Sequence, residues 1–275
     1  MTIVAGMGSP TGTGVGPLIR GWRERRQLSQ LQLAVRADSS ARHLSFVENG
    51  RARPGRDLLL RLAEQLDVPV RERNSLMLAA GYAPHYPETP LADPSMDALR
   101  GGVERLLAAH DPYPAVVLDG TFQVLAANRS LALLLDGVDP QLLRLPFNAV
   151  RVALHPDGLA PQIVNFRQWR GHLLARLEHR LELVRAEPLR RLYEEVRGYP
   201  EPAEDGPAGD GAGHGHPFAL PLRVRRDGRV LSFLSTIATF NTPLDVTVSE
   251  LAMETFLPAD PETVRYLQSV VGPER

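Results

Sequence analysis

The densest group of side chains able to contact a partner lies between Ser29 and Pro54, in SQLQLAVRADSSARHLSFVENGRARP. An arginine can clamp a guanine edge with two hydrogen bonds, worth ~1–3 kcal/mol of discrimination. The residues that we expect to face a DNA major groove are Gln30, Ser40, Ala41, Arg42, His43, Ser45 and Phe46. The loop arginines that we expect to neutralise phosphates, adding affinity without sequence choice, are Arg51, Arg53 and Arg56.

Two short helices would have to position these side chains. Apolar spacing predicts the first over residues 30–35, and a polar break follows at residues 37–40. Ser40 can N-cap a second helix that continues to about Asn49. Gly50 is expected to end it, because glycine readily adopts the left-handed conformation that follows many helices. Two helices joined by a tight polar turn are typical of a helix-turn-helix, whose second helix enters the major groove.

These residues closely resemble the Xre/lambda-repressor-like class of bacterial DNA-binding domains. The resemblance covers Leu18 to about Ala83 and rests on LIRGWRERRQLSQ, LSFVENG, RARP and LLLRLAEQLDVPVRERNSLMLAAGY. It implies an all-α domain that binds double-stranded DNA, in which Gln30 bonds a phosphate and braces the recognition helix. It also implies a homodimer on a two-fold operator. Ser39 departs from the class, which usually buries a valine or isoleucine there. The alternative is a helical bundle used only for protein contact.

Composition restricts the remaining possibilities. The chain has 275 residues, enough for two domains, with 43% hydrophobic and 23% charged residues. It contains no cysteine, which excludes disulfides, thiol catalysis and Cys-ligated zinc and fits a cytoplasmic protein. No run of about 18 apolar residues occurs, so we expect no membrane span. Residues 17–83 carry 12 Arg against 7 Asp plus Glu, a net charge of +5, which favours phosphate binding.

The rest of the chain divides by composition and pattern. Residues 1–16 are expected to be a disordered leader, and residues 17–83 the helix-turn-helix domain. The proline-rich residues 84–97 form the expected linker. Residues 98–272 predict an α+β domain with an antiparallel sheet. Its expected strands are residues 115–119, 122–126, 218–224, 230–240 and 245–256, and its expected helices include residues 128–135, 161–185 and 188–197 and one that begins at Asp260.

This second domain resembles a PAS-like fold, and more closely the MmyB-like ligand-binding domain that commonly follows an Xre-type domain in bacteria. The resemblance covers about Pro112 to Gln268. The segments that carry it are VLDGTFQVLAANRS, RVALHPDGLAPQIVNFRQWRGHLLARL and PLRVRRDGRVLSFLSTIATFNTPLDVTVSELAMETFLPAD. It implies an apolar pocket that accepts a small amphipathic molecule such as a fatty acid, with no further cofactor required.

Several residues are candidates for such a pocket. The expected apolar wall comprises Phe147, Leu154, Phe166, Trp169, Leu173 and Phe233. The expected polar anchors are Asn128, Asn148, Arg151, His155 and His172. Arg151 would suit a ligand carboxylate. The alternative is a filled core, with a second domain that serves only dimerisation or protein interaction.

Catalysis and metal binding are not expected. The sequence has no Gly-x-Ser-x-Gly motif, and neither Glu194–Glu195 nor His155 with Asp157 has a spacing that enforces acid–base chemistry. We therefore expect a regulator rather than an enzyme carrying a DNA-binding arm. His214 and His216 lie in a Gly-rich stretch, residues 201–216, that is expected to be a mobile loop. Such a loop lacks the second shell that fixes metal ligands.

Overall fold

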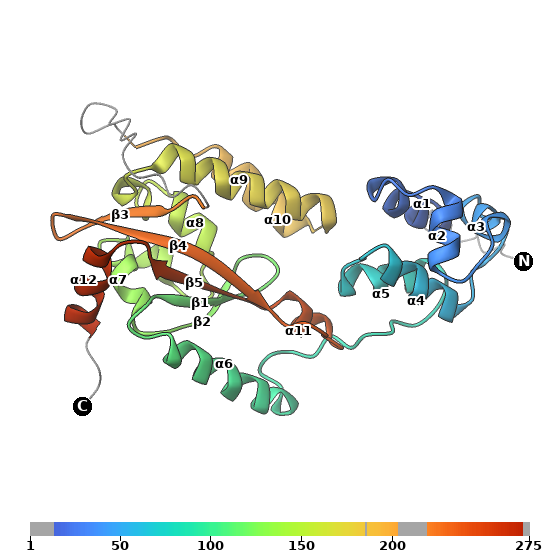
Figure 1. Ribbon diagram of the computed structural model, residues 1–275, viewed down its shortest axis with the longest axis horizontal. Helices are drawn as coiled ribbons and strands as arrows, with labels where there is room; N and C mark the ends of the chain where they lie inside the picture. The colour runs from blue at the N-terminus through green and yellow to red at the C-terminus, as the bar shows by residue number, and fades with distance from the viewer. Residues whose placement is uncertain (1–13, 185, 203–218, 272–275) are drawn as a thin grey trace, which may run out of the picture. The chain divides into compact units, whose positions relative to one another are not determined.

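The computed structural model describes residues 14–184, 186–202 and 219–271 and divides into two compact units near residue 88 (Figure 1). Each unit is described by itself. Most of the expected leader lies outside the described residues, as do residues 203–216 of the expected mobile loop with His214 and His216.

The first unit is helical. Its described residues form α1 (Val15–Arg25), α2 (Gln30–Arg36), α3 (Ala41–Glu48), α4 (Arg56–Gln65) and α5 (Val70–Ala79). Apolar side chains of all five helices fill one core, and Ile19, Leu33, Leu44, Leu62 and Met77 have at most 2% of their surface exposed. The predicted all-α helix-turn-helix fold is confirmed.

Local signals set the ends of α3 as predicted. The Ser40 hydroxyl accepts a hydrogen bond from the His43 amide at 3.1 Å and so N-caps the helix. At the other end α3 stops at Glu48, and Gly50 has φ +70°, a conformation that favours glycine. The side chains at the start of α3 are therefore held in a defined register.

The second unit contains a five-stranded antiparallel sheet in the order β2-β1-β5-β4-β3. The strands are β1 (Ala115–Leu118), β2 (Val124–Ala127), β3 (Leu222–Arg226), β4 (Arg229–Thr239) and β5 (Ala252–Pro258). Asp227 and Gly228 both have positive φ and connect β3 to β4, as expected for an Asp-Gly hairpin. The predicted α+β class with an antiparallel sheet is confirmed.

Helices cover both faces of this sheet (Figure 1). Val116 and Leu118 point into the main core with α7 (Leu131–Leu135), α8 (Ala149–Leu154), α9 (Phe166–Leu183) and α10 (Glu187–Arg197). Ala115 and Val117 point to the opposite face, toward α6 (Asp97–Ala109), because successive strand residues alternate. The shorter elements are α11 (Val246–Glu250), α12 (Pro261–Val271) and the 3-10 helices Pro94–Met96, Pro140–Leu143 and Ala160–Gln162.

Two predicted elements were wrong in part. The helix expected over residues 161–185 begins only at Phe166, because Pro161 lies in a 3-10 turn and Ile163 bridges Val224. Residues 245–256 were expected to form one strand, but Val246–Glu250 is helical and β5 starts at Ala252. Pairing with β1 and β4 also begins at Ala252, so β-propensity alone did not fix the strand start.

Candidate DNA-binding surface and ligand cavity

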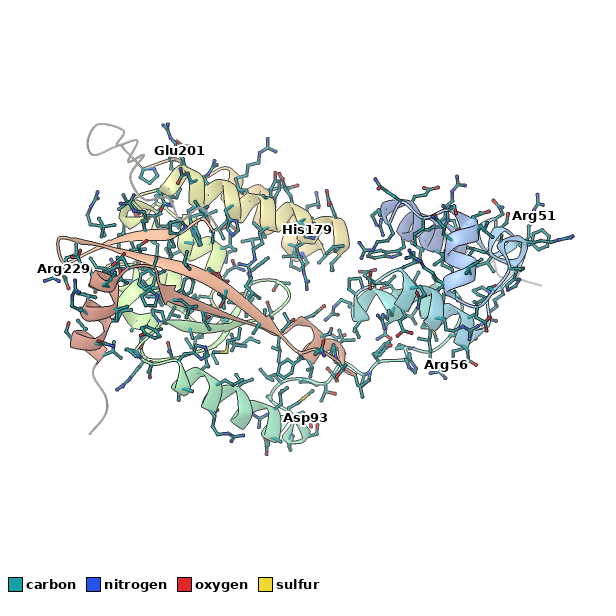
Figure 2. The ribbon with its side chains drawn as sticks, in the orientation of Figure 1. Arg51, Arg56, Asp93, His179, Glu201 and Arg229 are labelled. Carbon is teal, nitrogen blue, oxygen red and sulfur yellow. The ribbon has the colours of Figure 1, made fainter. Side chains whose placement is uncertain are left out.

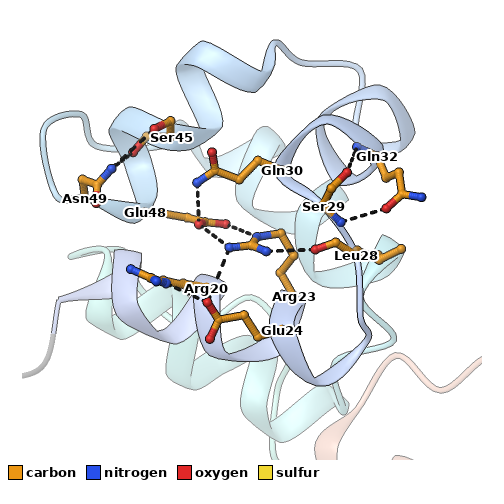
Figure 3. Close-up of polar contacts among 10 residues, drawn as sticks. All are labelled: Arg20, Arg23, Glu24, Leu28, Ser29, Gln30, Gln32, Ser45, Glu48 and Asn49. Atoms are coloured by element: carbon orange, nitrogen blue, oxygen red, sulfur yellow. Dashed lines mark hydrogen bonds and ion pairs between the residues drawn. The ribbon is translucent and has the colours of Figure 1, made fainter.

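One buried carboxylate ties the first three helices together (Figure 3). Glu48, at the end of α3, is 4% exposed. Its oxygens accept hydrogen bonds from Arg23 Nε at 2.6 Å, Arg23 Nη2 at 2.8 Å and Gln30 Nε2 at 2.8 Å. The hydrogen bond to Glu48 raises the pKa of Arg23. Gln30 thus braces the recognition helix, while its expected phosphate contact stays a prediction.

The start of α2 is fixed by a reciprocal cap. Ser29 Oγ accepts from the Gln32 amide at 3.1 Å, and Gln32 Oε1 accepts from the Ser29 amide at 2.8 Å. This capping box fixes the first turn of α2 and so the direction in which the Gln30 side chain points. Sequence reasoning missed the Arg23–Glu48 pair. The signal that could have found it is a glutamate on the face of α3 that carries the buried Leu44 and Val47.

The side chains expected to reach DNA are accessible to differing degrees. Arg42 is exposed, and its guanidinium lies 5.5 Å from the centre of the Phe46 ring one turn along α3. Ser40 is also exposed, whereas Gln30, Ala41, His43, Ser45 and Phe46 are half-buried. Arg51 lies at the outer surface of the helical unit (Figure 2), and its guanidinium makes no hydrogen bond or ion pair with a described residue. Neither the Arg42 nor the Arg51 side chain donates a hydrogen bond to a described residue, so both retain donors for a nucleic acid.

The other two loop arginines are held within the protein. Arg53 Nη2 donates to the Gly81 carbonyl at 2.9 Å, and its guanidinium lies 4.3 Å from the centre of the Tyr82 ring. Arg56 Nη2 donates to His85 Nδ1 at 2.9 Å. Both side chains secure the segment after α5, so their expected phosphate contacts would compete with these bonds.

The α+β unit contains a cavity of about 80 Å³ between the sheet and the helices of the main core. Three of the expected wall residues line it, namely Phe147, Trp169 and Leu173. Aliphatic and aromatic side chains supply the rest of the wall, except for Arg176 and Glu254. Pockets for drug-sized ligands span ~300–1000 Å³, so this cavity accommodates only a small group without expansion.

The other expected wall residues pack in the core without lining the cavity. Leu154, Phe166 and Phe233 are all buried in the main cluster. The two expected asparagine anchors bond backbone instead. Asn128 Oδ1 accepts from the Ala115 amide at 3.0 Å, and Asn148 Oδ1 accepts from the Val150 and Arg151 amides at 3.1 Å.

The expected charged anchors also lie outside the cavity wall. Arg151 donates from Nε and Nη2 to Glu195, each at 2.7 Å, and Tyr199 donates to the same carboxylate. Burial, reinforced by the bond to Glu195, raises the pKa of Tyr199 to about 12. His155 Nδ1 accepts from the Asp157 amide at 3.0 Å, and the His172 ring lies 5.3 Å from that of Trp169. The charged side chains that line the cavity are instead Arg176 and Glu254.

Arg176 and Glu254 form the charged part of the cavity wall. Arg176 Nη1 donates to Glu254 Oε2 at 3.0 Å, and Ser235 Oγ donates to Glu254 Oε1 at 2.6 Å. The Arg176 guanidinium also lies 5.0 Å from the centre of the Phe122 ring. Sequence reasoning missed this pair, although Arg176 follows Trp169 and Leu173 at the i+7 and i+3 spacing of one helix face.

Two further findings concern other classes of site. Within residues 14–184, 186–202 and 219–271, no group of three or more His, Asp or Glu side chains could hold a metal ion. Among the helices of those same residues, none is long and apolar enough to cross a membrane.

Comparison with known proteins assigns both units. The family model for the MmyB-like transcription regulator ligand binding domain matches residues 99–270, which comprise most of α6 through α12. The chain belongs to this family. A helix-turn-helix family model matches residues 19–73 of this MmyB-like regulator, from within α1 into α5. The protein is therefore a DNA-binding helix-turn-helix regulator with a C-terminal domain of a ligand-binding type.

The chain is 22% identical to the clp gene regulator ClgR from Corynebacterium glutamicum over 34% of this chain and 84% of that chain, with a TM-score of 0.22. No curated protein matches this MmyB-like regulator.

Proposed function

We propose that this regulator is a cytoplasmic homodimer that binds a two-fold DNA operator, and that a small amphipathic ligand in the α+β unit changes its DNA affinity. The observation that carries the proposal is an apolar cavity, with one ion pair in its wall, in a chain that also contains a braced recognition helix. The proposal involves no catalytic step.

The helical unit supports the DNA-binding part. Arg42, near the start of α3, has a guanidinium free to read a base edge, and the half-buried Phe46 restricts its orientation. Arg51 supplies a positive charge for a phosphate. Helix-turn-helix proteins commonly bind as dimers whose symmetry matches that of the operator, and this is the basis for the proposed homodimer.

The cavity supports a ligand with an apolar body. Burial contributes about 0.8 kcal/mol per methylene, which favours an acyl chain. A fatty acid combines such a chain with a head that an arginine can bind. Because the cavity measures only about 80 Å³, short and medium acyl chains should enter with less rearrangement than long ones.

A thermal-shift series tests the ligand class. Protein would be unfolded and refolded without lipid, checked by native mass spectrometry, and titrated with straight-chain acids from butanoate to hexadecanoate. We expect a rise in melting temperature that is largest at medium chain length, because ligand binding stabilises the folded state. An unchanged melting temperature across the whole series would overturn the ligand-binding function.

The small cavity volume favours a second candidate function. A domain with a nearly filled core can serve only dimerisation or protein interaction. In that case native mass spectrometry would show a dimer with no co-purified small molecule, and no acid would shift the melting temperature.

A further inference from the structure

The cavity wall is charged at one place, where α9 meets the middle strand of the sheet. Glu254 lies on β5, which has β1 on one side and β4 on the other. Its side chain is only 8% exposed, and that of Arg176 is 21% exposed. A buried ion pair costs desolvation energy that well-packed apolar side chains would avoid. The position of this pair in the wall of an apolar cavity therefore points to a role in binding.

The Arg176 guanidinium has N–H groups that are not used in its bond to Glu254. Only Nη1 bonds Glu254, and Nε and Nη2 make no hydrogen bond with a described residue. A guanidinium presents five N–H groups in a fork that fits carboxylates. We propose that Arg176 is the head-group subsite for a ligand carboxylate, which binds beside Glu254, and that one proton is taken up by this pair of carboxylates on binding. This inference rests on the proposed ligand-binding function and specifies its ligand class.

Charge balance in the cavity is the reason that ligand binding should be accompanied by uptake of one proton. In the free protein the charges of Arg176 and Glu254 cancel. A second carboxylate would leave a net negative charge in an apolar cavity, which is strongly unfavourable. Two carboxyl groups that face one another in such a site share a proton instead of both ionising. The proton comes from the acid form of the buffer, which loses it, and it forms an O–H bond with one of the two carboxyl groups that donates a hydrogen bond to the other.

Within the described part of the chain, few other titratable groups lie near Glu254. The residues paired with it on β1 and β4 are Val116 and Ile237, and the β4 neighbour that bonds it is Ser235. From α9, Arg176 and His172 are close enough to interact electrostatically. Partial burial, followed by the charge of Arg176, lowers the pKa of His172. Among the described residues, His172 is therefore the competing proton acceptor that the experiment must separate from the carboxylates.

Isothermal titration calorimetry with octanoate, in buffers of different ionisation enthalpy, measures the protons taken up. At pH 8 the wild-type protein should take up about one proton per octanoate, and the dissociation constant should rise roughly tenfold per pH unit above that. Glu254→Gln removes the second carboxylate, so it should abolish proton uptake and tighten octanoate binding at pH 8 by about tenfold. His172→Gln should leave the uptake intact.

Further variants separate the head-group contact from folding. Arg176→Gln alone would leave Glu254 buried without its cation, so the double variant Arg176→Gln/Glu254→Gln keeps the site neutral. Relative to Glu254→Gln, the double variant should lose at least tenfold in affinity for octanoate and keep its affinity for 1-octanol, since a bidentate Arg–carboxylate contact is lost. Arg167→Gln, an exposed position on the same helix, should match wild type.

Each outcome decides one question. Octanoate binding without proton uptake in the wild type, or with equal uptake in Glu254→Gln, overturns the shared-proton subsite while the ligand-binding function stands. Binding of 1-octanol without binding of octanoate overturns the carboxylate subsite alone. If neither compound binds, the inference fails, and failure of the whole acid series in addition would overturn the proposed function.

Discussion

Glu48 is the residue on which the geometry of the helix-turn-helix depends most. It accepts hydrogen bonds from α1 through Arg23 and from α2 through Gln30, and it belongs to α3 itself. The side chain of Glu48 is 1% exposed and that of Arg23 is 11% exposed. If these hydrogen bonds were lost, water could therefore not easily take the place of the missing partner.

Glu48→Ala should destabilise the folded protein by about 3 kcal/mol, because it removes the two short hydrogen bonds of the largely buried Arg23 and leaves the exposed Glu24, 3.8 Å away, as its remaining carboxylate neighbour. The measurement is chemical denaturation followed by circular dichroism. The control is Glu24→Ala, which removes an exposed carboxylate that bonds Arg20 at 2.8 Å and lies 3.8 Å from Arg23, and which should change stability little because the Glu24 side chain is 55% exposed. Similar losses for both variants would contradict the bracing role of Glu48.

Arg42 and Arg51 should differ in what they contribute to DNA binding. Arg42→Ala should weaken binding to a duplex selected from a random library by roughly fivefold to 150-fold and leave random DNA nearly unaffected. Arg51→Ala should weaken binding to both and reduce the salt dependence by about one phosphate contact. Gel-shift titrations at two salt concentrations measure both effects. Equal losses on selected and random DNA for Arg42→Ala would exclude base reading by that residue.

At the scale of elements, α1 and α3 approach closely at a glycine. A Cβ on Gly16 would lie 2.4 Å from the Val47 carbonyl oxygen and 2.6 Å from that of Glu48. Both oxygens belong to backbone, so relief requires the two helices to move apart. Gly21, further along α1, has no such contact, and the nearest atom to its added Cβ is Arg25 Nη1 at 4.0 Å.

Gly16→Ala should therefore destabilise the helical unit by ~1–3 kcal/mol through overpacking. Gly21→Ala should instead stabilise it by up to ~1 kcal/mol, because alanine favours a helix interior over glycine. Thermal melts of the two variants give the comparison. A neutral or stabilising Gly16→Ala would mean that α1 and α3 are not in close contact.

Elements with local signals could be predicted from the sequence, and those set by distant partners could not. Ser40 and Gly50 mark the ends of α3, and Asp227-Gly228 forms the β3–β4 hairpin, because each acts on backbone within a few residues of itself, Ser40 through its hydroxyl and the others through positive φ. The start of β5 depends instead on pairing with β1 and β4. The same distinction applies to the cavity, where Arg176 and Glu254 are 78 residues apart and no local pattern joins them.

The polar residues expected to anchor a ligand could likewise not be assigned from the sequence, because their bonding partners are set by the fold. Asn128, Asn148 and Arg151 had suitable chemistry, but the fold uses them to bond backbone amides and Glu195. Buried polar groups need partners, and those partners are known only once the chain is folded. Trp169 and Leu173 were placed in the cavity wall because helical spacing puts them on one buried face.

For the whole molecule, the proposed function requires that ligand and DNA influence one another's binding. Typical coupling free energies of ~1–3 kcal/mol correspond to about a fivefold to 150-fold change in affinity. A ligand that binds one conformation better must shift DNA affinity, and DNA must shift ligand affinity by the same factor. Sedimentation of the complex with a selected duplex should show two copies of the chain per operator.

The most direct test is the DNA dissociation constant of the full chain for a selected duplex, measured with and without saturating octanoate. We expect a change of at least about fivefold. Ala153→Leu, which adds bulk at the cavity wall, should keep the unliganded DNA affinity and lose the response. An unchanged dissociation constant, in protein shown by calorimetry to be saturated with octanoate, would contradict the account.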